Sequence, residues 1–511
     1  MLLDRLTQTW SALAATRSRL AKRQLIADVL RETPDADVET VVAYLSGSLR
    51  QRRTGVGGRS LQDLPPPATE PSLTVAEVDA AFERIAALSG SGSVVARSAA
   101  VAGLFGRATA AEQHFLRGLV FGELRQGASE AAVQEGLAAA YGVPLAAVRR
   151  AAMLTSSTVA AAALLHAGGQ AALEAVGLSV GTAVQPMLAA SAPDPAAAAE
   201  KAGLPAGVDY KLDGIRVQVH RDGDAVRVFT RSLDDITARL PEVVDAVRAL
   251  PHDRLVLDGE VLALRSDGRP EVFQAVASRT MSSADEPVPA AGPGLALRPF
   301  FFDLLHVDGR DLLDTPLRER VAVMRSLLPT ELLVPREEAV DAETVARVFA
   351  EAVGRGYEGV VVKNLDAPYA AGRRNSAWVK VKPRHTFDLV VIAVEWGYGR
   401  RQGWLSNLHL AARDGDGLVM LGKTFKGMTD EMLRWQTEHF LGLETRRTPG
   451  VVHVRPTTVV EIAVDGLQVS TRYPGGVALR FARVLRYRPD KDAEQADTLD
   501  TVRALSPVLP D

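Results

Sequence analysis

Apolar residues recur at helical spacing through the first third of the chain. In segments 1–50 and 73–178, Ala, Leu and Val return every three or four positions, as in AAVQEGLAAAYG. This period is typical of amphipathic helices. The Gly- and Pro-rich segment 52–72 between them is predicted to be a loop or linker. The pattern therefore predicts an all-helical domain over residues 1–178.

The pattern changes near residue 179 to short strands separated by turns. Apolar runs such as RLVLDGEVLAL, RPFFFDLLHVDG and SAWVKVKP are typical of strands, and helical stretches such as ETVARVFAEAVGRG lie between them. The Pro-rich segment ADEPVPAAGPG (284–294) is predicted to be a flexible surface insertion. We expect an α+β domain over residues 179–383.

Beyond residue 384, one strand pattern follows another with glycine turns between them. Examples are FDLVVIAVEWGYG, SNLHLAARDGDG and TVVEIAVDG. Such a succession predicts a small β-barrel over residues 384–511. The chain of 511 residues is long enough for three domains of this kind.

Composition narrows the class of protein. The chain is 47% hydrophobic and 24% charged, which is ordinary for a soluble protein, and no apolar run reaches the ~18 residues needed to span a bilayer. Because the chain has no cysteine, disulfides, Cys-bound zinc and a thiol nucleophile are excluded. We expect a cytoplasmic protein without membrane contact. The net charge of −3 means that any contact with a polyanion must use a local face.

Lysine is rare in this chain. There are nine lysines against 50 arginines, and none lies between Lys22 and Lys201. Arginine cannot replace an ammonium that must deprotonate and attack, or that must act as a compact charge on phosphate. This distribution suggests that the remaining lysines have functional roles. The alternative is that coding bias towards arginine left a few lysines by chance.

The stretch DYKLDGIRVQVH (209–220) contains the first candidate, Lys211. The alternating apolar and polar residues allow two interpretations of Lys211. It is either a buried lysine within a strand or a nucleophile. Attack on phosphorus needs a neutral amine, so we expect burial and nearby cations to lower the pKa of Lys211. Gly214 would let a phosphate approach the backbone, and Arg216 would clamp a phosphate or a ribose.

Two motifs supply carboxylates. LDGE (257–260) is expected to end a strand with Asp258 and Glu260 on the same side. EGVVVK (358–363) places Glu358 before a buried strand and Lys363 at its far end. Carboxylate oxygens suit Mg²⁺, although LDGE alone could also be the rim of a hairpin.

Two further motifs supply a ring and a lysine pair. FFFD (300–303) places Phe300 and Phe302 on one face, and WVKVKP (378–383) directs Lys380 and Lys382 the same way. Core packing and an edge strand protected by lysines are the simpler explanations for each alone. Because all five motifs fall within one domain, they together indicate chemistry on a triphosphate with Mg²⁺.

These motifs, with TRSLDDIT (230–237), resemble those of the ATP-dependent DNA ligases, a family of covalent nucleotidyltransferases. The resemblance implies that Lys211 becomes adenylated. It also implies roles for the other motif residues: Asp209 at the adenine edge, Arg216 and Arg231 at the sugar or phosphate, Glu260 at the ribose or metal, Phe302 stacked on adenine with Phe300 as competitor, Glu358 at the metal, Arg374 at ATP, and Lys380 and Lys382 at the α-phosphate.

The ends of the chain extend the resemblance. LRFARVLRYRPDK (479–491) resembles the last motif of the family, on its OB-fold domain, with Ala482 where a proline is common. There Arg488, Asp490 and Lys491 would orient the pyrophosphate. The helical front, with GVGGRS and GELRQGA, resembles the DNA-binding domain of the larger replicative-type ligases.

The resemblance implies three domains: an all-α DNA-binding domain, an α+β nucleotidyltransferase (adenylation) domain and a β-barrel OB-fold domain. It implies a monomer that uses ATP and Mg²⁺, with Mn²⁺ as a substitute, to seal nicked duplex DNA in replication, repair and recombination. An RNA ligase or a GTP-using capping enzyme is the nearest alternative. A non-catalytic DNA-binding relative should have lost one of Lys211, Glu260, Glu358 or Lys382, and all four are present. NAD-dependent ligases carry a Cys-bound zinc, which this chain cannot have.

Overall fold

The structure is a computed structural model that describes residues 1–51, 54–122, 124, 129–271, 273, 275–277, 296–370 and 374–505. Within these ranges it does not describe the side chains of Arg59, Arg374, Asn375 and Arg400. The insertion predicted at 284–294 and most of the GELRQGA segment lie outside the described residues.

The described residues up to Glu174 form helices around one apolar core, in agreement with the predicted helical domain. The helices are α1 (Leu3–Ala15), α2 (Arg19–Arg31), α3 (Val38–Leu45), α4 (Val75–Ala87), α5 (Ser93–Gly106), α6 (Ala110–Phe121), α7 (Glu130–Tyr141), α8 (Leu145–Leu154) and α9 (Thr158–Glu174). Thr74 and Thr109 begin α4 and α6 with capping boxes, in which the threonine and a glutamate three residues later satisfy each other's backbone N–H groups.

The central part contains two five-stranded sheets. The first has the order β1-β10-β9-β2-β8, with β1 (Leu188–Ser191), β2 (Ala206–Tyr210), β8 (Arg336–Ala339), β9 (Val360–Asn364) and β10 (Arg374–Val381). The second has the order β4-β3-β5-β6-β7, with β3 (Ile215–Asp222), β4 (Ala225–Thr230), β5 (Arg254–Ala263), β6 (Leu297–Val307) and β7 (Arg310–Asp311). Helices α10 (Pro195–Ala202) and α14 (Ala342–Gly354) pack on the first sheet, and α11 (Pro241–Arg248) and α13 (Leu317–Leu327) pack on the second. An α+β domain is thus confirmed.

One motif lies elsewhere in its strand than predicted. LDGE (257–260) falls in the middle of β5 and does not end it, because β5 stays paired with β3 and β6 as far as Val261 and Ala263. Asp258 and Glu260 nevertheless both face Arg216, as their common side required.

The C-terminal part is an OB-fold-like arrangement of strands. Its main sheet contains β11 (His385–Trp396), β12 (Leu405–Asp414), β13 (Gly417–Thr424), β14 (Glu444–Thr448), β15 (Val451–Val454), β16 (Val459–Val464) and β19 (Arg483–Tyr487), and β17 (Gly466–Val469) pairs with β18 (Val477–Arg480). The sheet can curve around its core because the long β11 pairs with β12 along one edge and with both β15 and β16 along the other. The short helix α16 (Leu499–Arg503) follows the last strand.

A helix interrupts the strands of this part, where the sequence analysis expected strands only. Helix α15 (Asp430–Gly442) begins after Thr429, whose hydroxyl accepts a hydrogen bond from the backbone N–H of Met432. Leu433, Gln436 and Phe440 recur at helical spacing and are buried. The cap and this spacing explain why the segment is helical.

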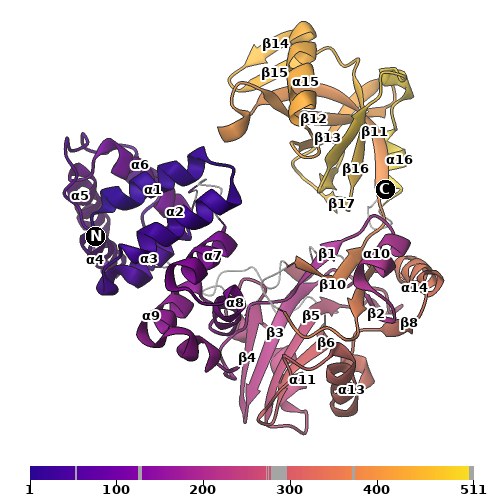
Figure 1. The fold of residues 1–511 in the computed structure, drawn as a ribbon. Helices are drawn as coiled ribbons and strands as arrows, with labels where there is room; N and C mark the ends of the chain where they lie inside the picture. The colour runs from indigo at the N-terminus through magenta and orange to yellow at the C-terminus, as the bar shows by residue number, and fades with distance from the viewer. Residues whose placement is uncertain are drawn as a thin grey trace.

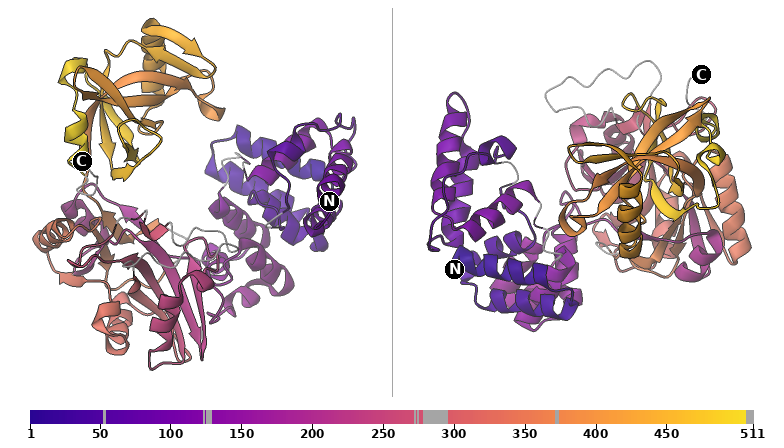
Figure 2. Two further views of the ribbon diagram at one scale, coloured as in Figure 1. Left: turned by 180° about the vertical axis from the view of Figure 1, so that it is seen from behind. Right: turned by 90° about the horizontal axis from the view of Figure 1, so that it is seen from above.

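The helical part and the C-terminal barrel attach to different sides of the central part (Figures 1 and 2). The helical part is joined to the central sheets by an apolar cluster that contains Met153 and Leu154 of α8 together with residues such as Met187 and Trp378. Arg150 adds a two-pronged ion pair with Asp314, at 2.8 Å for each contact. Among the residues described, we find no helix with the length and apolarity needed to cross a membrane.

Candidate active site

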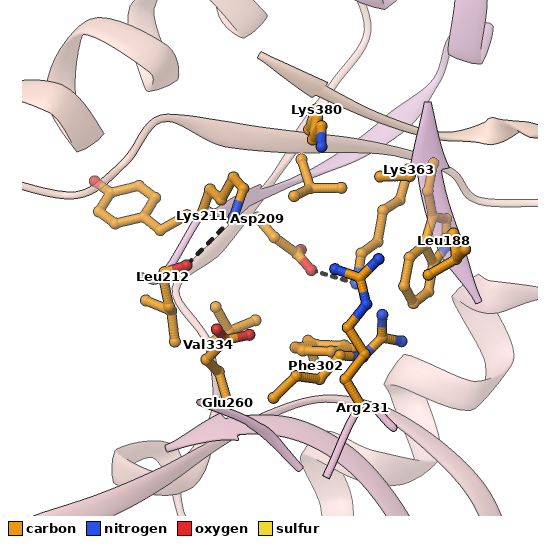
Figure 3. Close-up of a pocket in the computed structure, with 15 residues that line it drawn as sticks. Leu188, Asp209, Lys211, Leu212, Arg231, Glu260, Phe302, Val334, Lys363 and Lys380 are labelled. Atoms are coloured by element: carbon orange, nitrogen blue, oxygen red, sulfur yellow. Dashed lines mark hydrogen bonds and ion pairs between the residues drawn. The ribbon is translucent and has the colours of Figure 1, made fainter. Parts of the chain in front are cut away.

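A pocket lies between the two central sheets (Figure 3). Seven of the residues predicted from the sequence line it: Asp209, Lys211, Arg216, Arg231, Glu260, Phe302 and Lys380. Lys211 and Lys380 come from the side of the first sheet, and Glu260 and Phe302 from the second. The motifs that lie far apart in the sequence therefore meet at one place.

Lys211 follows directly after β2 and is fixed by its backbone. Its N–H donates to the carbonyl of Gly359 at 2.8 Å, and the N–H of Glu358 donates to the carbonyl of Lys211 at 3.0 Å. This pairing brings the Lys211 ammonium to 2.5 Å from Glu358 Oε2. The other oxygen of Glu358 pairs with Lys382. One carboxylate thus joins two of the predicted lysines.

The prediction that burial and nearby cations lower the pKa of Lys211 was wrong. Burial acts to lower that pKa, but the nearby carboxylates of Glu358 and Glu260 outweigh it and raise it. The pKa of Glu358 is lowered for the matching reason, because Lys211 and Lys382 outweigh its burial. These carboxylates therefore favour the protonated form of Lys211.

Glu260 projects from the middle of β5 and accepts a hydrogen bond from the Gly214 N–H at 3.2 Å. Burial raises the pKa of Glu260 to about 7, against the opposing charges of Lys211 and Arg216. Gly214 is required because a Cβ there would overlap the carbonyl oxygen of Val261. The close approach at Gly214 is therefore to β5, whereas the sequence analysis assigned it to a phosphate.

Glu260 and Glu358 are the residues that could hold a metal ion. Both act on Lys211, and both are carboxylates that Mg²⁺ accepts as ligands. The described part of the chain contains no group of three or more potential metal ligands of the His, Cys, Asp and Glu types. The residues fit Mg²⁺, which usually takes one or two protein carboxylates and completes its shell with water and phosphate oxygens.

Arg216 is more firmly held than predicted. Its guanidinium donates to both oxygens of Asp258 at 3.0 and 2.7 Å and to the carbonyl of Met187 at 2.7 Å. Tyr369 donates its hydroxyl proton to the same Asp258 at 2.7 Å. Asp258 is therefore engaged by protein groups, and Arg216 lines the pocket as a fixed positive charge.

A second charged cluster surrounds Asp209, which is buried in the pocket wall. Its carboxylate accepts from Arg336 Nε, from Arg336 Nη2 at 2.7 Å, and pairs with Lys363 Nζ at 2.7 Å. The Lys363 ammonium also lies 4.3 Å from the ring centre of Phe302 and 4.0 Å from that of Trp378. Burial lowers the pKa of Lys363 to about 8.

The sequence analysis missed Arg336 and placed Lys363 only at the far end of a buried strand. Lys363 carried a signal, since it is a rare lysine at the end of the apolar strand VVVKN. Arg336 carried none, because it is one of 50 arginines and lies 127 residues from Asp209.

The structure distinguishes the two candidate rings. Phe302 lines the pocket, whereas Phe300 does not and is buried in an apolar cluster with Leu212, Leu262 and Val334, against which Phe302 also packs. The neighbouring Asp303 points away and forms a fully buried, two-pronged ion pair with Arg320 at 2.7 and 2.9 Å. Only Phe302 of this motif is thus placed to meet a ligand in the pocket.

The boundary with the C-terminal part adds charges to the site. Lys382 lies 3.6 Å from Asp465, which also pairs with Arg483 at 3.3 Å. Arg480 donates to Asp213, in the KLDGIR motif, at 3.0 Å. The last motif therefore reaches the pocket region through Arg480 and Arg483.

Three predicted residues of that last motif do not line the pocket. Arg488 and Lys491 pair with Asp388 at 2.9 and 2.6 Å, and Arg488 also pairs with Asp490 at 2.7 Å. These contacts all lie inside the C-terminal part. Arg374 begins strand β10, but its side chain lies outside the described residues.

Comparisons with known proteins cover all three parts of the chain. Residues 186–382 match the ATP dependent DNA ligase domain, residues 401–491 the ATP dependent DNA ligase C terminal region, and residues 59–138 the DNA ligase N terminus. A solved structure named Pmar-Lig_PreS3 has a TM-score of 0.63 at 20% identity and covers 94% of this chain and 99% of its own. That likeness shows a shared fold.

Curated relatives are similar over their full length. A protein of Nocardioides sp. described as a probable DNA ligase is 62% identical over 512 residues, which cover 99% of each chain. A probable DNA ligase of Beutenbergia cavernae is also 62% identical, over 99% of this chain and 100% of that one. With these relatives and the three matched regions, the chain belongs to the ATP-dependent DNA ligase family.

Proposed function

We propose that this protein seals nicks between a 5′-phosphate and a 3′-hydroxyl in duplex DNA, using ATP and a covalent Lys211–AMP intermediate. Sealing through an adenylate is the general mechanism of the family. One observation supports the choice of residue most strongly: the Lys211 ammonium lies 2.5 Å from Glu358 at a pocket that also contains Glu260, Phe302 and Lys380. We assign the helical domain, 1–178, to DNA binding, 179–383 to adenylation and 384–511 to the OB fold of a monomeric enzyme.

The first step joins AMP to the protein. The Lys211 amine attacks the α-phosphorus of ATP, so that a P–N bond forms, the bond to pyrophosphate breaks, and the amine loses its proton. Phe302 stacks on adenine, Asp209 contacts the adenine edge, and Arg216, Arg231 and Arg374 contact the sugar or the phosphates. Lys380 and Lys382 neutralise charge on the α-phosphate.

Mg²⁺ at Glu260 and Glu358, for which Mn²⁺ would substitute, would supply positive charge beside the phosphoryl oxygens. Glu358 also pairs with Lys211 and Lys382. The carboxylates around Lys211 raise its pKa, whereas burial acts to lower it and favours the neutral, nucleophilic amine.

The later steps use the same pocket and the DNA. The 5′-phosphate of the nick attacks the AMP phosphorus, the P–N bond breaks, and Lys211 is regenerated. The 3′-hydroxyl then attacks the activated 5′-phosphate, and AMP leaves. The helical domain and the barrel lie on different sides of the central part (Figure 2), so they can close on a duplex, mainly through backbone contacts that ignore sequence. During the first step, Arg488, Asp490 and Lys491 would orient pyrophosphate, which requires the barrel to turn relative to the arrangement seen here.

The test uses ATP labelled at the α-phosphate. The wild-type protein should form an acid-labile AMP adduct, and Lys211→Arg should form none. Lys201→Arg, which changes an exposed lysine on α10 of the same domain, is the matched control and should be labelled normally. An adduct on Lys211→Arg would place the nucleophile elsewhere. Sealing of nicked DNA but not of nicked RNA in the same tubes separates this function from that of an RNA ligase.

A further inference from the structure

The Asp209 carboxylate has room for one more hydrogen bond. An ionised carboxylate offers about four acceptor positions on its two oxygens. Two accept hydrogen bonds from Arg336, and the ion pair with Lys363, whose Nζ lies 2.7 Å from Oδ2, takes up at most one more. Asp209 also lines the pocket, so the remaining position is available to a donor on a bound molecule.

Arg336 orients the Asp209 carboxylate without itself lining the pocket. It stands directly opposite Asp209 in the pairing of β2 with β8, is 3% exposed, and is absent from the pocket lining. Its Nη2 also donates to the backbone carbonyl of Phe302 at 2.9 Å. One guanidinium therefore ties the carboxylate to the strand that carries the pocket's aromatic ring.

Lys363 cannot fix the carboxylate in the same way. An ammonium is a point charge that tolerates rotation of the carboxylate plane, whereas a guanidinium fork holds both oxygens in one plane. The Lys363 ammonium itself lies close to the rings of both Phe302 and Trp378. The direction of the free acceptor position on Asp209 thus depends on Arg336.

We infer that Arg336 is a positioning residue for nucleobase selection, which holds Asp209 so that its free lone pair meets the exocyclic amino group of adenine. A 6-oxopurine presents an acceptor at the same place and leaves the buried carboxylate facing another lone pair, so it is rejected. The inference rests on the proposed function, in which the pocket takes ATP and Asp209 reads its base.

The experiment measures adenylylation by ATP and by inosine triphosphate, which differs from ATP at the purine 6-position. The proteins compared are the wild type, Arg336→Gln, Arg336→Lys and Asp209→Asn. Arg336→Gln should raise KM for ATP about tenfold to a hundredfold and leave kcat within about threefold, because base contacts contribute equally to ground-state and transition-state binding. The preference for ATP over inosine triphosphate should fall at least about tenfold.

The pairing of the two residues gives a sharper criterion. If Arg336 acts through Asp209, the effects of Arg336→Gln and Asp209→Asn on KM are not additive in the double variant, whereas independent effects add. A general loss of packing would lower the active fraction for both nucleotides and leave their ratio unchanged. An unchanged ratio in folded Arg336→Gln, or full additivity, overturns the inference.

Arg336→Lys keeps the charge and decides the matter if the glutamine variant does not fold. It should fold, yet lose discrimination by at least about fivefold, because the fork is gone. Discrimination equal to that of the wild type overturns the inference. Failure of the proposed function shows differently, since then the wild type is not labelled by ATP or Lys211→Arg still is.

Discussion

Two carboxylates at the candidate active site, Asp209 and Glu358, each pair with two cations, yet their surroundings differ. Asp209 and Arg336 have side chains only 3% exposed, and all partners of this cluster lie in the central part of the chain. Glu358 and Lys211 are 15% and 22% exposed, and Lys382 extends their cluster to Asp465 of the C-terminal barrel.

This difference in exposure suits the Asp209 cluster to recognition of the nucleotide and the Glu358 cluster to the transfer reaction. A buried charge that loses its partner is costly, so the Asp209 cluster keeps one arrangement and can serve as a fixed template. Partly exposed ion pairs are worth little net free energy, so the Glu358 cluster can exchange its partners during a reaction. The same residue types thus serve opposite tasks according to their contact with water.

The largest effect on stability should follow from breaking the buried cluster. Asp209→Ala leaves Arg336 and Lys363 without their counter-ion and should lower the free energy of unfolding by about 3–5 kcal/mol. Urea denaturation measures this. Glu358→Ala is the matched variant and should cost less, about 1–2 kcal/mol, because Lys211 and Lys382 keep partial contact with water. Equal losses in the two variants would remove the distinction between the clusters.

The second prediction concerns activity. Glu358→Gln should slow single-turnover adenylylation by about 10²–10³, because a preorganised charge beside the reacting phosphate is lost. Its urea midpoint should stay close to that of the wild type. Glu343→Gln, which changes an exposed glutamate in the first turn of α14, serves as control and should keep the wild-type rate. A slow control or a fast Glu358→Gln would contradict the assignment.

The third prediction is a pH dependence of the buried cluster. The pKa of Lys363 is lowered from 10.5 to about 8 in the folded protein, mainly by burial. Between these values the unfolded chain binds more protons than the folded one, so this group makes the free energy of unfolding rise with pH. The wild type should gain up to about 3 kcal/mol relative to Lys363→Met between pH 8 and 10.5. Parallel profiles would show that Lys363 does not titrate in this window, and Lys201→Met should give no such difference.

The smallest effect is expected at the edge of the exposed cluster. Asp465→Asn removes the contact with Lys382, at 3.6 Å, and the pairing with Arg483. Because these are partly exposed pairs, adenylylation should change by less than about fivefold, and the change should shrink at high salt. A loss of more than tenfold would mean that the barrel controls the state of Glu358.

The sequence predicted the residues that lie on alternating strands inside recognisable motifs. Glu260, Phe302 and Lys380 reach the pocket because alternation fixes the side from which each projects. It could not predict Arg336, since no local pattern tells which of many arginines will face Asp209 across β2 and β8. It also gave the wrong direction for the pKa of Lys211, because the sign depends on carboxylates brought in from β5 and from the start of β9.

The missed helix α15 has a different origin. A Thr cap and buried positions at 433, 436 and 440 were available in the sequence, but the surrounding run of strands outweighed them. Contacts between distant segments determine the position of Arg336 and the pKa of Lys211. For α15, the local signals would have been sufficient to predict the helix.

The apolar cluster that joins α8 to the pocket wall bears on how such a chain can diversify. Met153 and Leu154 share this cluster with Trp378, whose ring lies beside Lys363. A helical domain taken from a distant relative would therefore have to fit the pocket wall around Trp378 as well as the linker. Recombination between lineages is constrained at this seam, and substitutions on α8 and around Trp378 should be inherited as matched sets.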